Sequence, residues 1–455
     1  MKYERLLERQ RTFFCSGKSK EYSYRINALK ALREALVYYE EEINQALLED
    51  LNKSPYETFI TEYGLALQQI RLAERKLKGW MKPLRKKVGI TGLPGKAYEL
   101  AEPYGVALII SPWNYPLSLA IQPLIGAIAA GNCCIMKPSE LSPHTSNMLA
   151  KIVARAFSEE YVAVVLGGKE ESERLLEQRF DYIFFTGSTA VGRSVMDKAA
   201  RHLTPVTLEL GGKSPCIITA DANVREAAKN IAYGKVMNSG QICIAPDYVL
   251  ADETVAEQFC REFAEQCQRM VRDALTNSKY PRIISQKHFK RLQGLMEGTV
   301  IKSGGRSDPE TLKIEPTVLV DVKPDSPVMQ EEIFGPLLPV LTFRTLDEAE
   351  DFVQAREKPL ALYLFTTSKE TERKVLNSLS FGGACVNDTI SHIACEGLAF
   401  GGVGQSGMGA YHGIHSFETF SHRKGIYKKS GLFELSMRYQ PYGDKASRLL
   451  RFLMK

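Results

Sequence analysis

Short apolar segments alternate with amphipathic segments between Val106 and Ile218, and this alternation restricts the possible folds more than any other feature. The apolar runs are too short for helices and are bounded by turn residues, which predicts strands, and the segments between them have helical periodicity. Strands are predicted over 106–111, 133–137, 162–166, 182–186, 206–210 and 216–218, and helices over 117–130, 145–158, 170–178 and 190–200. Strands that alternate with helices form parallel sheets covered on both faces, so we predict a doubly wound arrangement.

A second series of strands and helices follows from 222 to about 387. Its strands are predicted near 248–251, 318–322 and 338–343. Helical periodicity covers most of 2–80, and turn residues between short β-prone runs predict a hairpin over 86–102. The fold class is therefore α/β, with two stacked doubly wound domains, the first of the Rossmann type, and a small arm. We place the first domain at 1–208 with the arm at about 83–102, the second domain at 209–398, and a C-terminal tail at 399–455.

The composition is that of a globular protein without a nucleic-acid-binding surface. Of the 455 residues 44% are hydrophobic and 25% are charged, and the net charge of 59 − 53 = +6 is spread along the chain. The N-terminus runs straight into a charged amphipathic pattern, so no signal peptide is predicted. The nine cysteines contain no C-x-x-C pair, which predicts free thiols in a reducing compartment, and we expect a cytoplasmic protein. His412 and His415 lack a cluster of cysteines or carboxylates, so no metal site is expected.

The stretch from Tyr104 to Met136 contains no charged residue and is long enough to span a membrane. Three prolines and one Gly-Asn break interrupt it. We therefore predict a strand, a tight loop and a buried helix in place of a membrane span.

One cysteine stands in a segment that suits a nucleophile. Cys243 ends the run Asn-Ser-Gly-Gln-Ile-Cys, with small and polar residues before it and an apolar run downstream. The reactive form of cysteine is the thiolate, so a catalytic thiol needs a base or a polarising environment nearby. Ser239 and Gly240 would let backbone N–H groups near the thiol approach a substrate oxygen closely. Alone, the segment also fits a small buried apolar residue, so its interpretation depends on the rest of the chain.

Two polar residues in or just after predicted strands supply the other groups that cysteine chemistry needs. Asn114 lies between two prolines, and its amide could donate to a developing oxyanion, although such an asparagine also fits a turn. Glu209 places a charge inside the apolar strand 206–210. Because burial raises the pKa of a carboxyl group, Glu209 is a candidate general base.

Two further strand ends are candidate cofactor sites. The run 184–192 passes from an apolar strand through Gly187 and Ser188 into a helix, whose N-terminus can bind an anion. Lys137 and Glu140 follow another strand, at the edge where open α/β sheets bind ligands, and both could reach ribose hydroxyls. An ordinary turn and a solvated ion pair are the alternatives for these two segments.

Two glycine motifs lack the context that a nucleotide site requires. The G-x-G-x-x-G pattern at 402–407 follows no predicted strand and opens no helix. The run 212–214 resembles the end of a P-loop, but Thr207 stands where that motif needs glycine. We interpret both motifs as loops.

Together these segments resemble the aldehyde dehydrogenase superfamily, and most closely its class 3 type. They stand in the family's order and, because seven of them are in register from Pro112 to past Phe420, the resemblance is specific. The short N-terminal region, the Gln-Ile-Cys context and the tail after Tyr411 favour class 3. The segments are PWNYP (112–116), KPSE (137–140), FTGSTAVG (185–192), LELGGKSP (208–215), NSGQICIAPDY (238–248), EEIFGP (331–336) and FGGVGQSGMGAYHG (400–413).

The resemblance implies oxidation of medium-chain, long-chain or aromatic aldehydes to carboxylic acids with NAD, and with NADP as well. Cys243 would form a thiohemiacetal and then a thioester, with the oxyanion held by the Asn114 amide and the Cys243 backbone N–H. Glu209 would activate water, and Tyr115 would line the substrate pocket. Glu140 favours NAD, because its charge would repel a 2′-phosphate. The residues implied in cofactor binding are Trp113, Lys137, Glu140, Gly187, Ser188, Gly192, Leu210, Glu332 and Phe334.

By the same resemblance, 1–208 binds the cofactor, 209–398 is catalytic, and 399–455 with the hairpin serves oligomerisation as a homodimer. Two other functions remain open. A coenzyme A-acylating relative would pass the thioester to coenzyme A, but the presence of Glu209, which activates water, argues against it. A non-catalytic binding or structural relative would be expected to have lost Cys243 or Glu209, and the sequence retains both.

The end of the chain, 444–455, is a short amphipathic and basic segment. It has no apolar run of about 20 residues, so it cannot span a membrane. We expect it either to pack on the protein or to make weak, salt-sensitive contact with an anionic membrane surface. The apolar residues are Leu449, Leu450, Phe452, Leu453 and Met454, and the basic residues are Arg448, Arg451 and Lys455.

Overall fold

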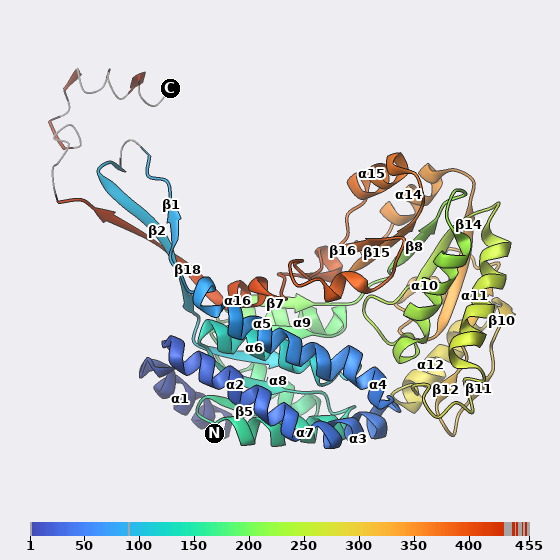
Figure 1. Ribbon diagram of the computed structural model, residues 1–455, viewed down its shortest axis with the longest axis horizontal. Coiled ribbons are helices and arrows are strands. Elements are labelled where there is room, and N and C mark those ends of the chain that lie inside the picture. Colours follow the sequence, from blue (N-terminus) through green and yellow to red (C-terminus); the bar gives the residue numbers. More distant parts are fainter. Residues whose placement is uncertain are drawn as a thin grey trace.

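Two large, mostly parallel sheets form the body of the protein, as a computed structural model shows (Figure 1). The first sheet lies beside a small three-stranded arm, and the second sheet lies at the opposite end of the molecule. These sheets confirm the predicted α/β class. The structure describes residues 2–89, 92–431, 439–441, 443, 444, 448, 451 and 452.

The first sheet has six strands in the order β17-β7-β6-β3-β4-β5, and only β17 runs antiparallel to its neighbour. Ile110 lies opposite Lys137 on one side and Phe185 on the other, and Thr186 lies opposite Glu209. The carboxyl ends of four neighbouring strands therefore meet at one edge. The strands are β3 (Val106–Ile110), β4 (Cys133–Lys137), β5 (Val162–Val164), β6 (Tyr182–Thr186), β7 (Val206–Glu209) and β17 (Gly407–Met408).

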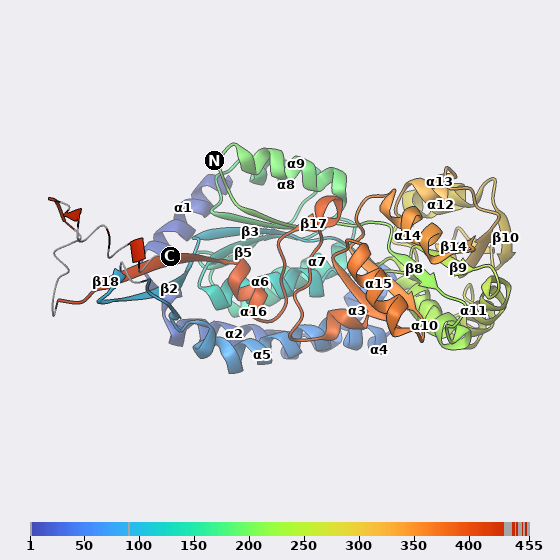
Figure 2. The ribbon, with the colours of Figure 1, turned by 90° about the horizontal axis from the view of Figure 1, so that it is seen from above.

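Helices cover both faces of this sheet, as the predicted alternation requires. Helices α8 and α9 lie on one face, and α6 lies on the other with α2 and α5 outside it (Figure 2). All thirteen residues of α6 are buried, which explains why the 104–136 stretch carries no charge. The helices are α1 (Lys2–Cys15), α2 (Tyr22–Tyr38), α3 (Glu40–Leu51), α4 (Pro55–Thr58), α5 (Gly64–Trp80), α6 (Ser118–Ala130), α7 (Pro143–Ala156), α8 (Lys169–Leu176) and α9 (Thr189–Ala200).

The second sheet has seven strands in the order β10-β13-β14-β9-β8-β15-β16. The prediction that 216–218 ends the first series of strands is wrong, because β8 pairs with β9 and β15 in the second sheet. An apolar strand pattern reports burial on both faces and does not report which sheet accepts the strand. The strands are β8 (Pro215–Ile218), β9 (Tyr248–Asp252), β10 (Val300–Ser303), β13 (Thr317–Val320), β14 (Leu337–Phe343), β15 (Ala361–Phe365) and β16 (Gly383–Val386).

Further helices and two small strands complete the second body (Figures 1 and 2). Helices α10 and α11 pack against each other beside the sheet. Helix α14 connects β14 to β15, and α15 connects β15 to β16. Strands β11 (Ser307–Asp308) and β12 (Lys313–Ile314) form a separate pair. The helices are α10 (Val224–Val236), α11 (Ala256–Val271), α12 (Gln286–Met296), α13 (Pro327–Gln330), α14 (Leu346–Gln354) and α15 (Lys369–Ser378).

The arm is a sheet of β1 (Leu84–Lys86), β2 (Gly95–Pro103) and β18 (Ser421–Lys429). The predicted hairpin accounts for β1 and β2. The third strand comes from the tail, more than three hundred residues later in the chain, and pairs with the whole length of β2, from Ser421 opposite Pro103 to Lys429 opposite Gly95. The first and last parts of the sequence are therefore joined by a continuous antiparallel ladder.

Before it reaches the arm, the tail packs against the first sheet. Strand β17 extends the sheet beyond β7, and α16 (Ile414–Thr419) packs on α6. Phe420 is fully buried, with its ring centroid 5.7 Å from that of Phe184 and 5.2 Å from that of Tyr182. The tail thus contributes apolar side chains to the core.

No helix in the described part of the chain is long and apolar enough to cross a membrane. Of the amphipathic segment predicted near the C-terminus, only residues 444, 448, 451 and 452 are described, and the Phe452 side chain is 80% exposed. The other apolar and basic residues of that prediction lie outside the described residues.

Candidate active site

Cys243 follows a turn whose backbone is held in an unusual conformation. The backbone φ values of Asn238, Ser239 and Gly240 are 48°, 52° and 70°. They lie in the left-handed region, which residues other than glycine rarely adopt. A Cβ atom on Gly240 would lie 2.3 Å from the carbonyl oxygen of Gly335, so glycine is required there. Such backbone persists only where its surroundings fix it, and it concentrates at functional sites.

The side chain of Gln241 supplies much of that fixation. Its amide nitrogen donates to the carbonyl oxygens of Asn238 and Arg282, both at 3.0 Å, and its amide oxygen accepts from the Ile284 N–H at 3.0 Å. Ser239 Oγ donates to the Pro281 carbonyl at 2.5 Å. The turn is therefore bonded to the segment around Arg282 rather than exposed to solvent.

Asn114 lies against this turn, with only 2% of its surface exposed. Its side-chain Nδ2 donates to the carbonyl oxygen of Gln241 at 3.0 Å, and its own carbonyl accepts from Asn238 Nδ2 at 2.9 Å. An amide nitrogen carries two hydrogens, so one N–H of the Asn114 side chain is left for another acceptor. The structure thus joins two segments that are far apart in the sequence.

Glu209 ends strand β7 and faces the same pocket as Cys243. It is 2% exposed, and neither carboxyl oxygen has a hydrogen-bond partner among the described residues. Burial raises the pKa of Glu209 well above its usual range. A buried carboxyl group without a partner is costly for folding alone, which points to a functional role.

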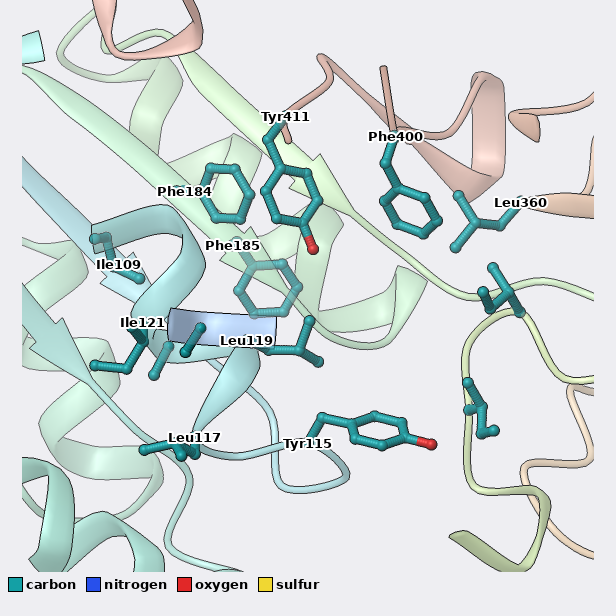
Figure 3. Packing of buried hydrophobic residues seen from close by; sticks show 14 of the residues in the cluster. Ile109, Tyr115, Leu117, Leu119, Ile121, Phe184, Phe185, Leu360, Phe400 and Tyr411 are labelled. Atoms are coloured by element: carbon teal, nitrogen blue, oxygen red, sulfur yellow. The ribbon is translucent and has the colours of Figure 1, made fainter. Parts of the chain in front are cut away.

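The pocket at Cys243 is lined mainly by apolar side chains, and Figure 3 shows part of the packing around it. Phe400 and Tyr411 come from the tail, and the Tyr411 ring lies 5.1 Å from the Phe184 ring and 5.8 Å from the Phe400 ring. Tyr115 also lines the pocket, and its buried hydroxyl has no partner among the described residues. The remaining lining includes Ile60, Thr61, Leu65, Ser118, Leu119, Gln122, Tyr233, Met237, Ile242, Ile244, Ile390, Ile393 and Ala394.

Burial also governs the ionisation of the thiol. The pKa of Cys243 is raised, first by burial and then by the nearby carboxyl groups of Glu332 and Glu209. The backbone N–H groups of Cys243 and Ile244 act in the opposite direction and favour the thiolate. Burial and the carboxylate of Asp247 raise the pKa of Glu332 to about 8. The thiol is therefore protonated at neutral pH until its surroundings change.

The residues predicted to bind the cofactor fall into four contact groups, the last of which is the turn after β6. Trp113 and Phe334 meet edge to face with ring centroids 5.3 Å apart, and the His288 ring lies 5.3 Å from the Trp113 ring. Glu332 lies close to Gly211. A Cβ atom on Gly211 would be 2.0 Å from the Oε2 atom of Glu332. Lys137 Nζ is 3.8 Å from Glu140 Oε2.

The turn after β6 forms a separate group. Gly187 N–H donates to the Glu209 carbonyl at 3.0 Å, which ties this turn to the end of β7. Ser188 occupies the N-cap position of the twelve-residue helix α9 without a side-chain capping bond, and the first N–H groups of the helix can bind an anion. A Cβ atom on Gly192 would lie 2.5 Å from Leu210 Cδ2, so glycine lets α9 approach the strand end closely.

Comparisons with known proteins cover nearly the whole chain. The sequence profile described as the aldehyde dehydrogenase family matches residues 3–426. The chain belongs to the aldehyde dehydrogenase family. Aldehyde dehydrogenase family 3 member B1 from Bos taurus is 45% identical over 452 residues, which cover 99% of this chain and 97% of the relative. This similarity confirms the class 3 resemblance, and the chain is an NAD(P)-dependent aldehyde dehydrogenase that oxidises aldehydes to carboxylic acids.

Two further similarities extend over nearly the whole chain. The dimeric NADP-preferring aldehyde dehydrogenase of Rattus norvegicus is 44% identical over 445 residues, which cover 97% of this chain and 98% of the relative. A solved structure, the substrate-bound state of Staphylococcus aureus AldH, superimposes with a TM-score of 0.97 at 43% identity and covers 99% of both chains. The two α/β domains are therefore those of the family.

The residues present fit a dinucleotide cofactor. The carboxyl ends of β4, β3, β6 and β7, in that order, meet at one edge of the sheet, and the N-terminus of α9 stands at the same edge. The Oε1 atom of Glu332 is buried without a partner among the described residues, so it can accept from a ribose hydroxyl. When bound, NAD(P) supplies the acceptor for a hydride.

Sequence reasoning found the polar residues of the site but missed much of its wall. Phe400 and Tyr411 belong to a tail that the sequence assigned to oligomerisation, and His288 carries no motif around it. Met237 and Ile393 are single apolar residues, which in a sequence resemble any other core residue. Among the described residues no three His, Cys, Asp or Glu side chains come together as metal ligands.

The influence of Glu332 on the thiol leads to a prediction. Without cofactor, alkylation of Cys243 by iodoacetamide should rise with pH, since only the thiolate reacts. Above about pH 8 the Glu332 carboxylate is charged and opposes ionisation of Cys243. Glu332→Gln should therefore be alkylated about threefold to tenfold faster at about pH 9, and at the wild-type rate below about pH 7.

Mass spectrometry of the peptide that contains Cys243 measures this rate apart from the other eight cysteines. Glu331→Gln is the matched control, because Glu331 is exposed and pairs with Arg291 at 2.9 Å. Equal alkylation rates for Glu332→Gln and wild type at high pH would show that Glu332 does not influence the thiol.

Proposed function

We propose that Cys243 is the nucleophile, Asn114 an oxyanion donor and Glu209 the general base of this aldehyde dehydrogenase. The observation that supports the proposal is the convergence of Cys243 and Glu209 on one apolar pocket, with Asn114 bonded to the turn that carries the thiol. These groups come from three separate parts of the chain, and the carboxyl group of Glu209, which has no partner among the described residues, would be costly to bury without a use.

The reaction begins when the Cys243 thiolate attacks the aldehyde carbon and forms a thiohemiacetal. The oxyanion accepts hydrogen bonds from the remaining N–H of the Asn114 side chain and from the Cys243 backbone. Each such donor typically contributes about 10²-fold to 10³-fold to the rate. Loss of the hydride from the former aldehyde carbon leaves a thioester on Cys243.

Glu209 takes a proton from water, which then attacks the thioester and releases the carboxylic acid. Its raised pKa suits this role, because an ionised carboxylate with a high pKa is a strong base. The role of Glu209 as the base for water also distinguishes this enzyme from the two alternative functions, a coenzyme A-acylating and a non-catalytic relative. A coenzyme A-acylating relative needs no base for water, and a non-catalytic relative needs neither Cys243 nor Glu209.

The cofactor is NAD or NADP, held by three groups of residues. Lys137 and Glu140 bind the adenosine ribose, and the α9 N-terminus at Gly187 and Ser188 binds the pyrophosphate. Glu332 binds the nicotinamide ribose, with Trp113 and Phe334 packed beside it and Leu210 seated against Gly192. Domain 1–208 would thus bind the cofactor, and 209–398 would carry the thiol. The rat relative at 44% identity is named NADP-preferring, which agrees with use of both cofactors.

The substrates are apolar aldehydes of medium or long chain, or aromatic aldehydes. The pocket wall is mainly aliphatic and aromatic, and burial of each methylene group contributes about 0.8 kcal/mol to binding. Its polar groups are few, and Tyr115 stands among them with an unpaired hydroxyl in the described part of the chain. Short, charged aldehydes should therefore react poorly.

Rapid mixing of enzyme, NAD and an apolar aldehyde tests the three roles. Cys243→Ser should keep cofactor affinity and lose at least about 10³-fold in turnover, because a serine hydroxyl is scarcely ionised. Glu209→Gln should form a burst of NADH followed by a slow steady state, because only thioester hydrolysis is impaired. Retention of a tenth of the turnover by Cys243→Ser, or normal turnover by Glu209→Gln, would contradict the assignment.

The arm supports the further proposal of a homodimer. Among the described residues its outer strands, β1 and β18, each pair with β2, and an edge strand can pair with a strand of another chain. The rat relative is named dimeric. Light scattering at micromolar concentration should give about twice the 50.9 kDa of one chain, also for a chain that ends at Ser430 and keeps β18. A stable monomer would contradict the proposal.

We also propose a cytoplasmic enzyme whose C-terminal segment makes at most a weak membrane contact. The nine cysteines all have free thiols, which agrees with a reducing compartment. Sedimentation with anionic vesicles should show little binding at low salt and none at about 0.5 M salt, where charges are screened within about 4 Å. The chain that ends at Ser430 is the control. Binding that survives high salt and needs the tail would show an apolar anchor.

A further inference from the structure

A fully buried ion pair lies directly behind the loop that carries Asn114. Lys53 Nζ is 2.6 Å from Glu62 Oε1, and neither side chain has any exposed surface. Lys53 lies in the break between α3 and α4, and Glu62 lies in a π-helical turn, Phe59–Tyr63. Neither residue belongs to the motifs that identify the family in the sequence.

The pair holds the loop that leads from β3 into α6 at its middle and at its end. Lys53 Nζ also donates to the Asn114 carbonyl at 2.8 Å and lies 3.9 Å from the centroid of the Tyr115 ring. The second carboxyl oxygen of Glu62 accepts from the N–H groups of Leu117 at 2.9 Å and Ser118 at 3.2 Å. The backbone from Asn114 to Ser118 is thus fixed by one lysine and one glutamate.

A second acidic residue joins this group to the turn before Cys243. Glu57 Oε1 accepts from the Asn238 N–H at 2.7 Å, and Asn238 Nδ2 donates to the Asn114 carbonyl. Glu57 also lies near enough to Lys53 for that cation to lower its pKa, although burial raises the pKa overall. The Asn114 carbonyl therefore receives two donors, one from the buried lysine and one from the cysteine turn.

Stability alone does not account for this arrangement. Removal of two charges from water is costly, and well-packed apolar residues in place of a buried ion pair often leave a protein equally or more stable. The pair instead fixes the position of the loop that carries Asn114, because three of its hydrogen bonds end on backbone atoms of that loop. The π-helical turn that carries Glu62 also indicates a functional role, since such turns are rare and frequently occur at functional sites.

We propose that Lys53 and Glu62 are positioning residues of the oxyanion site. They hold the backbone of Asn114, and the bond from its Nδ2 to Gln241 fixes one hydrogen of the side chain. The other N–H is then left in a single orientation, toward the oxygen of the bound aldehyde. This inference depends on the proposed role of Asn114 as an oxyanion donor.

A double-mutant cycle with Asn114 tests the proposal. Lys53→Met/Glu62→Met removes both charges together, which avoids an unpaired buried charge. With a good aldehyde substrate, it should lower kcat/KM by about tenfold to hundredfold, because a misplaced oxyanion donor loses most of its effect. In an Asn114→Ala background the same pair of substitutions should lower kcat/KM by less than about twofold, since the donor is already absent.

Two comparisons separate positioning from folding. Arg33→Met/Glu74→Met removes another ion pair, at 3.0 Å between α2 and α5, and should change kcat/KM less than about twofold. NAD affinity and thermal unfolding, measured for every variant, identify those that fold. If Lys53→Met/Glu62→Met does not fold, Lys53→Met/Glu62→Gln replaces it in the cycle, because it also leaves no unpaired buried charge and glutamine keeps the volume and one carbonyl acceptor.

The outcomes are distinct. A folded Lys53→Met/Glu62→Met variant with wild-type kcat/KM would overturn the proposal. The same fold-loss with and without Asn114 would also overturn it, because the pair would then act on the enzyme generally. A wild-type rate for Asn114→Ala alone would remove the oxyanion role itself, and a wild-type chain inactive on all aldehydes would remove the proposed function.

Discussion

The close approach of two backbone segments organises this active site. Gly240, in the turn before Cys243, faces the Gly335 carbonyl at a distance that leaves no room for a side chain on Gly240. Lys235, fully buried, donates to the same carbonyl at 2.9 Å. Because Gly335 follows Glu332 and Phe334, this contact places the proposed nicotinamide-binding segment beside the proposed nucleophile. The left-handed turn is therefore a consequence of bringing two functional segments together.

Burial gives the site its chemistry as well as its shape. The thiol of Cys243 and the carboxyl groups of Glu209 and Glu332 all have raised pKa values, and burial is the first cause in each case. A protein interior disfavours charge on each of these groups until another charge or dipole compensates. Ionisation of these groups thus depends on the charges and dipoles around them, and the raised pKa of Cys243 favours the protonated thiol at neutral pH.

Much of the fold could be predicted from the sequence because its strands are short, apolar and regularly spaced. The strands 133–137 and 182–186 have the predicted bounds. Strands β3, β7, β9 and β14 each differ from the prediction by one residue, at one end only. Sheet membership was not predictable for β8, because its apolar side chains fit the interior of either sheet. The polar site residues could be predicted because their segments stand in the order of the family's motifs and because Glu209 places a charge inside an apolar strand.

The residues that escaped prediction are those whose role depends on contacts between distant segments. Lys53 stands in an ordinary break between helices, Asn-Lys-Ser-Pro, and nothing near it in the sequence shows that it is fully buried. Phe400 and Tyr411 lie in a glycine-rich tail. They line the pocket because the tail returns to the edge of the first sheet, where β17 pairs with β7. Glycines permit that return, since Gly407 and Gly409 have positive φ values and their α-carbons lie against β7. The N-terminal helices and the tail, which carry no catalytic motif, thus determine where the proposed catalytic groups can lie.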